Sequence, residues 1–138
     1  MLVQSDLVKS ELSALHDAAS RLGSVQIRNV ATLGGNICNA APSADTAGPL
    51  LVLGATAVLE GPKGRRRVPL IKFFTGTYQT VRQPDEVLIE FDIPEEMGRF
   101  GSAYWKHSRR KAMELPLIGI AVAFRLSEDQ GEILDARI

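Results

Sequence analysis

The sequence predicts an α+β fold, in which short helices accompany a mainly antiparallel sheet. Two observations carry this prediction. Apolar residues near the start recur at helical intervals of four and three, at Val8, Leu12 and Leu15. Further along, short apolar stretches are joined by glycine-containing turns such as 61–64, and this pattern is typical of β-hairpins.

Composition bounds the class of protein. The chain has 138 residues, enough for one domain with a hydrophobic core. Its 16 basic residues balance 16 acidic ones, which gives no electrostatic reason to expect nucleic acid or an anionic membrane as a partner. No apolar run approaches the roughly 18 residues of a membrane span, and no signal peptide is evident. The single cysteine, Cys38, excludes an internal disulfide and a four-cysteine cluster, so the cytoplasm is the expected location.

The helical elements are predicted from their spacing and end signals. Residues 6–22 form an amphipathic helix that Ser5 or Asp6 can cap and Gly23 can end. Residues 24–28 are extended, and a polar block with three asparagines and two adjacent glycines follows, up to Asp45. A further helix is predicted at 46–53, with Pro49 in its first turn and Gly54 at its end. Strands are predicted at 55–60, 65–70, 87–94, 102–108, 117–126 and 132–138. A helical turn is predicted at 71–75 and a loop at 95–98.

The polar block is the candidate binding segment. Gly34 and Gly35 can take positive φ without a Cβ penalty, so we expect a sharply turning loop whose backbone comes close to a ligand. Successive N–H groups in such a turn form an anion site of the kind that holds phosphates. Thr32, Asn36 and Asn39 add short donors and acceptors. Taken alone, however, Gly-Gly-Asn is also an ordinary turn.

Three charged residues each have two interpretations. Asp45 is either an N-cap for the following helix or an acceptor for a ligand hydroxyl, and these two roles are compatible. Arg28 either pins the following loop through its carbonyls or forms a surface salt bridge. Lys106 would be an exposed strand lysine on the evidence of the residues alone. Tyr104 and Trp105 face opposite sides of that strand, so at most one of them shares the face of Lys106.

Several motifs together resemble one family. Residues 28–37 have the order Arg-Asn-x-Ala-Thr-x-Gly-Gly-Asn-Ile, and residues 40–45 continue as Ala-x-Pro-Ser-x-Asp. This block resembles the flavin-binding signature of the FAD subunits of molybdenum hydroxylases, which include the medium subunit of aerobic carbon monoxide dehydrogenase and the flavin domain of xanthine dehydrogenase. Residues 85–94 (Asp-Glu-x-Leu-x-x-x-x-Ile-Pro) and 103–110 (Ala-x-x-Lys-x-x-x-Arg) match as well. Residues 73–80 depart from the family because they lack its Pro-Gly pair.

The resemblance implies a fold, a cofactor and a set of contacts. The fold is that of the FAD-binding family named for vanillyl-alcohol oxidase and p-cresol methylhydroxylase, with its middle subdomain at 1–98 and the beginning of the C-terminal domain at 99–138. The cofactor is FAD, and the redox chemistry belongs to it, so no catalytic side chain and no metal ligand is expected. The implied contacts are Gly34, Gly35 and Asn36 to the diphosphate through backbone N–H groups, Ala31, Thr32, Asn39 and Asp45 along the ribityl and pyrophosphate region, and Val87, Leu88 and Lys106 near the isoalloxazine.

The resemblance also implies a function and partners. In such enzymes the substrate is hydroxylated at molybdenum on another subunit, and electrons pass through iron–sulfur clusters to FAD and then to NAD or another acceptor. The implied partners are a molybdopterin-binding large subunit and an iron–sulfur small subunit. Because family subunits are much longer, the chain is expected to be a fragment without the first FAD subdomain and most of the C-terminal domain. The alternatives are a scaffold or docking fragment that binds no flavin, and another flavoenzyme of this fold such as UDP-N-acetylenolpyruvoylglucosamine reductase.

Overall fold

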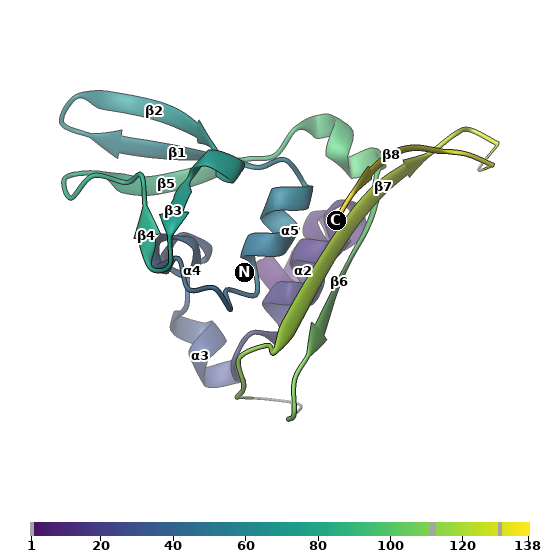
Figure 1. Ribbon diagram of the computed structural model, residues 1–138, viewed down its shortest axis with the longest axis horizontal. Coiled ribbons are helices and arrows are strands. Elements are labelled where there is room, and N and C mark those ends of the chain that lie inside the picture. Colours follow the sequence, from purple (N-terminus) through teal and green to yellow (C-terminus); the bar gives the residue numbers. More distant parts are fainter. Residues whose placement is uncertain (1, 111–112, 130) are drawn as a thin grey trace.

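The computed structural model describes residues 2–110, 113–129 and 131–138, and most of its helices precede its strands (Figure 1). The helical elements are η1 (Leu2–Gln4), α1 (Asp6–Glu11), α2 (Ser13–Arg21), α3 (Val25–Val30), α4 (Leu33–Asn39), α5 (Ala47–Val52), η2 (Leu70–Lys72) and η3 (Glu95–Arg99). The strands are β1 (Thr56–Gly61), β2 (Gly64–Pro69), β3 (Phe74–Gly76), β4 (Gln79–Thr80), β5 (Val87–Asp92), β6 (Gly101–His107), β7 (Ile118–Leu126) and β8 (Ile133–Arg137).

Within the described residues, the strands form three antiparallel sheets, in the orders β2–β1–β5, β3–β4 and β6–β7–β8. The β1–β2 hairpin runs from the pair Thr56–Pro69 to the pair Gly61–Gly64 and closes through the predicted turn. Helix α2 packs on β6 and α5 packs on β7, so both helices lie between the two larger sheets (Figure 1). The predicted α+β class with mainly antiparallel sheets is confirmed.

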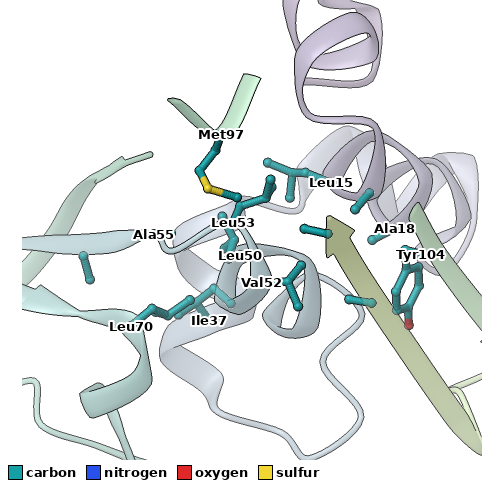
Figure 2. Packing of buried hydrophobic residues seen from close by; sticks show 14 of the residues in the cluster. Leu15, Ala18, Ile37, Leu50, Val52, Leu53, Ala55, Leu70, Met97 and Tyr104 are labelled. Atoms are coloured by element: carbon teal, nitrogen blue, oxygen red, sulfur yellow. The ribbon is translucent and has the colours of Figure 1, made fainter. Parts of the chain in front are cut away.

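One hydrophobic core joins the helices to both of these sheets. Figure 2 shows Leu15 of α2, Leu50 of α5 and Met97 gathered near Leu53, whereas Tyr104 belongs to the same cluster but lies farther from Leu53. The same cluster continues to the β1 side of the molecule through buried residues such as Leu59, Leu70 and Phe73. The core therefore connects residues from both halves of the chain.

The two faces of the β6–β7–β8 sheet differ. The face on the helices carries Tyr104 and Ala121, which are paired across β6 and β7 and are both buried. The opposite face carries the pair Trp105 and Ile120, which are 53% and 43% exposed. Tyr104 and Trp105 thus lie on opposite faces, as predicted.

The first predicted helix is two helices. Ser5 caps α1, since its hydroxyl accepts from the Val8 amide, but the helix breaks at Leu12. The start of α2 is held from another part of the chain, because the Ala14 amide donates to the Ser102 hydroxyl at 3.2 Å. A long-range hydrogen bond thus takes the place of a local cap, and the spacing of apolar residues cannot reveal it. Gly23, at φ +51°, follows the end of α2 as predicted.

Short helical segments replace other predicted elements. Residues 24–28 are not extended, because the Ser24 hydroxyl accepts from the Ile27 amide and begins α3. The helical turn predicted at 71–75 is shorter, since η2 ends at Lys72 and β3 begins at Phe74. The loop predicted at 95–98 lies in η3.

Helix α5 agrees with its prediction, with Pro49 in the first turn and Gly54 just beyond the end at φ +66°. Among the described residues, no helix is both long enough and apolar enough to span a bilayer.

Candidate functional site: two hollows at the start of α4

The glycine pair lies in the first turn of α4 and not in a loop, so that prediction is wrong. Thr32 is the N-cap, and its Oγ1 accepts from the Gly35 amide at 2.9 Å. Positive φ among the described glycines occurs at Gly23, Gly54 and Gly64 and not in this pair. The Asn36 amide donates to the Thr32 carbonyl, whereas the amides of the first two helical residues, Leu33 and Gly34, have no acceptor within the helix.

The lack of room for a side chain explains the glycine at position 35. A Cβ built on Gly35 would lie 2.8 Å from Thr32 Oγ1, which is closer than a Cβ can approach without displacing the capping hydroxyl. A Cβ built on Gly34 would lie 3.7 Å from Leu88 Cδ2 of β5, an ordinary contact. Gly35 is therefore matched to the cap, and Gly34 faces β5.

A groove of about 630 Å³ separates α4 from β5. It brings together five of the predicted site residues, Thr32, Gly34, Gly35, Val87 and Leu88. The other lining residues are Leu33, Cys38, Arg82, Glu86, Ile89, Glu90 and Phe91.

A second hollow, of about 460 Å³, lies on the other side of the α4 start, between η1, α2 and α3. Three predicted residues, Ala31, Thr32 and Asn36, line it. Thr32 and Leu33 line both hollows, so the two meet at the N-terminus of α4. The Asn36 Oδ1 accepts from the Thr46 hydroxyl at 2.6 Å, which ties α4 to the start of α5. Asn39 is exposed at the end of α4 and is not among the lining residues of either hollow.

Arg82 and Glu86 are two of the charged residues that line the groove. The Arg82 Nη1 donates to the Gln83 and Glu86 carbonyls, each at 2.9 Å. Burial raises the pKa of the Cys38 thiol, and the positive charge of Arg82 partly offsets this rise. Arg66 of β2 donates to both oxygens of Glu86, at 2.6 and 2.7 Å. These hydrogen bonds lower the pKa of Glu86 to about 2. Glu86, a lining residue of the groove, therefore stays ionised at neutral pH.

Arg28 follows neither of its two interpretations in full. Its Nη1 donates to the Leu22 carbonyl at 2.8 Å, so it anchors α3 to the preceding segment and not to the following block.

Asp45 is not the predicted N-cap, because Thr46 occupies that position and has no side-chain cap bond. The carboxylate turns instead toward β6, where Oδ1 accepts from the Tyr104 hydroxyl and Oδ2 from Lys106 Nζ, both at 2.9 Å. The side chains of Asp45 and Lys106 are only 5% and 7% exposed. Lys106 is thus a buried partner of Asp45 and not an exposed strand lysine.

Tyr104 is the functional candidate that the sequence reasoning missed. Burial and the hydrogen bond to Asp45 both raise the pKa of Tyr104 above its ordinary value, so its hydroxyl remains a donor. The available signal was its position two residues from Lys106, which places both side chains on one face of a strand.

Comparison with known proteins identifies the family of this arrangement. The family described as the FAD binding domain in molybdopterin dehydrogenase matches residues 1–96. The xanthine dehydrogenase FAD-binding subunit of Escherichia coli O157:H7 is 41% identical over 138 residues, covering 99% of this chain and 47% of that protein. The carbon monoxide dehydrogenase medium chain of Hydrogenophaga pseudoflava is 38% identical over 126 residues, covering 91% of this chain and 44% of that protein.

Solved structures agree with these matches. A chain of the carbon monoxide dehydrogenase from Hydrogenophaga pseudoflava superimposes with a TM-score of 0.90 at 36% identity, over 99% of this chain and 46% of that chain. This chain spans about half the length of the curated relatives that it matches. The chain therefore belongs to the family of FAD-binding domains of molybdopterin dehydrogenases, whose cofactor is FAD.

Proposed function

We propose that this chain is part of the flavin subunit of a molybdenum hydroxylase, an oxidoreductase in which electrons pass from iron–sulfur clusters through FAD to NAD or another acceptor. Its partners in this proposal are a molybdopterin-binding large subunit and an iron–sulfur small subunit. The relatives named as an FAD-binding subunit and as a medium chain support this assignment. We also propose a domain boundary between residues 98 and 99, which the family match over residues 1–96 supports.

One observation carries the proposal: two hollows meet at a capped helix start that presents free backbone amides. Their volumes, about 630 and 460 Å³, are within the range of small-molecule sites. An elongated dinucleotide needs two neighbouring spaces with an anion-binding point between them, and free amides at a helix N-terminus favour phosphate. The residues present therefore fit FAD.

The residues of the chain bind and orient the cofactor in this proposal. The amides of Leu33 and Gly34 hold the diphosphate, while Gly35 and Asn36, whose own amides are already hydrogen-bonded, shape the helix start. Ala31 and Thr32 line the path of the ribityl and pyrophosphate part, and Val87 and Leu88 contact the isoalloxazine.

Three further contacts rest on the family resemblance, those of Asn39, Asp45 and Lys106. When bound, FAD supplies the redox chemistry, so no side chain of the chain needs to act as acid, base or nucleophile.

The test is a titration with FAD followed by flavin fluorescence. We expect saturable binding by the parent chain and at least tenfold weaker binding by Gly35→Ala, because the new Cβ displaces the Thr32 hydroxyl that orders the helix start. Gly131→Ala is the matched control, since the three atoms nearest to a Cβ there belong to Asp129 and lie at ordinary contact distances of 3.5 Å or more. Equal affinity of all three proteins would show that FAD binds elsewhere, and no binding by the parent would contradict the proposal for this chain.

A further inference from the structure

Three side chains form a buried polar cluster between α5 and β6. Tyr104 and Lys106 share one face of β6, and each donates to a different oxygen of Asp45, which precedes α5. The Tyr104 side chain lies in the core among apolar residues (Figure 2). Each oxygen of the buried carboxylate therefore has its own donor.

The neighbouring strand leaves room for the phenol. A Cβ built on Gly119 of β7 would lie 2.6 Å from the Tyr104 hydroxyl oxygen and 3.2 Å from its ring. Gly119 is not among the described glycines with positive φ, so its backbone conformation is open to any residue. Position 119 therefore requires a residue without a side chain, because the hydroxyl end of Tyr104 occupies the space that a Cβ would fill.

We propose that Tyr104, seated against Gly119, is a positioning residue that fixes the Asp45 carboxylate and, through it, the Lys106 ammonium, which the proposed function assigns to the flavin. This inference rests on the proposed function for the part that concerns FAD. The physical reason is that a buried ion pair is stable only when its geometry is good and its remaining lone pairs are satisfied. Without the Tyr104 hydroxyl, one carboxylate oxygen loses its donor, and the pair can rotate and admit water.

The first arm of the test needs no cofactor. The rate of Lys106 acylation by an amine-reactive reagent is read by mass spectrometry in the ligand-free chain, with the exposed Lys72 as internal reference. We expect Tyr104→Phe to raise the Lys106 rate about tenfold, which is the size of effect expected from losing one hydrogen bond to a charged group. Tyr78→Phe, at the only other tyrosine, which is 66% exposed, should change nothing.

A double-mutant cycle separates positioning from general loosening. If Tyr104 acts through Asp45, then Tyr104→Phe has no further effect on the Lys106 rate in an Asp45→Asn background. Gly119→Ala provides a second variant that displaces the phenol without removing it, and it should also raise the rate. An unchanged Lys106 rate in Tyr104→Phe, or an equal increase in both backgrounds, overturns the proposal.

The second arm uses FAD. If the parent chain binds FAD, Tyr104→Phe should weaken binding severalfold and shift the absorption band of the bound flavin, whereas Tyr78→Phe should do neither. Unchanged affinity and spectrum would overturn the role toward the flavin. If the parent chain does not bind FAD, the proposed function fails, while the acylation cycle still decides whether Tyr104 positions the Asp45–Lys106 pair.

Discussion

Gly34 and Gly35 are neighbours in the first turn of α4, yet a side chain at each would meet different surroundings. Both positions gain helix propensity on replacement by alanine, so this gain cancels in a comparison of the two variants. Only at Gly35 does the Cβ displace the capping hydroxyl, and a lost N-cap costs about 1 kcal/mol. We therefore expect Gly34→Ala to have the larger free energy of unfolding, by about that amount, in urea titrations. Equal stabilities would mean that the Thr32 cap tolerates the new side chain.

The same two residues show what the sequence can and cannot reveal about the site. Their importance follows from the motif that contains them, and five of the predicted residues do line one groove. Their conformation does not follow, because adjacent glycines are equally compatible with a turn and with the crowded first turn of a capped helix. Asp45 and Lys106 each had two interpretations because the distance between them depends on how β6 packs beside α5.

Among the elements, the link between β2 and the segment before β5 depends on a charged pair. Arg66 donates to both oxygens of Glu86, and the Gln83 amide donates to one of them at 2.7 Å. The pKa of Glu86 falls from 4.5 to about 2, so the unfolded chain binds its proton more readily than the folded one. The stabilising contribution is complete above pH 4.5 and is lost as the pH falls toward 2.

The variant Glu86→Gln tests this contribution, because its amide does not titrate. We expect the free energy of unfolding of the parent to fall between pH 4.5 and 2 more steeply than that of the variant. The pH dependence of the free energy of unfolding of Arg66→Lys should lie between those of the parent and Glu86→Gln, because a lysine cannot form the bidentate contact with Glu86. Parallel curves for the parent and Glu86→Gln would contradict the assignment.

Element prediction succeeded where the signal is local. The β1–β2 hairpin was predictable because glycines bound its turn between two extended stretches. Helices α3 and α4 were missed because six or seven residues contain too few apolar positions to show a helical period. The capping residues Ser24 and Thr32 were the signals that could have revealed them. The start of α2 is held by a hydrogen bond to Ser102, far away in sequence, and no local pattern contains it.

At the scale of the whole molecule, the proposed boundary between residues 98 and 99 does not divide the hydrophobic core. Phe100 and Tyr104 belong to the same cluster as Leu53 and Phe73. A shared core couples the sheets, so we expect the chain to unfold in one cooperative transition. The only tryptophan, Trp105, lies on β6 and reports on one sheet, whereas far-ultraviolet circular dichroism reports on all elements.

Coincident urea midpoints from these two probes are therefore expected, and Leu53→Ala should lower both together. Leu53 is fully buried in the cluster that joins the helices to both sheets, and truncation of such a leucine costs about 2–5 kcal/mol. If β6, β7 and β8 formed an independent unit, the fluorescence of Trp105 would change at a different urea concentration from the circular dichroism. Leu53→Ala would then shift the two midpoints by different amounts. That outcome would separate the 99–138 region from the FAD-binding part energetically, despite their shared contacts.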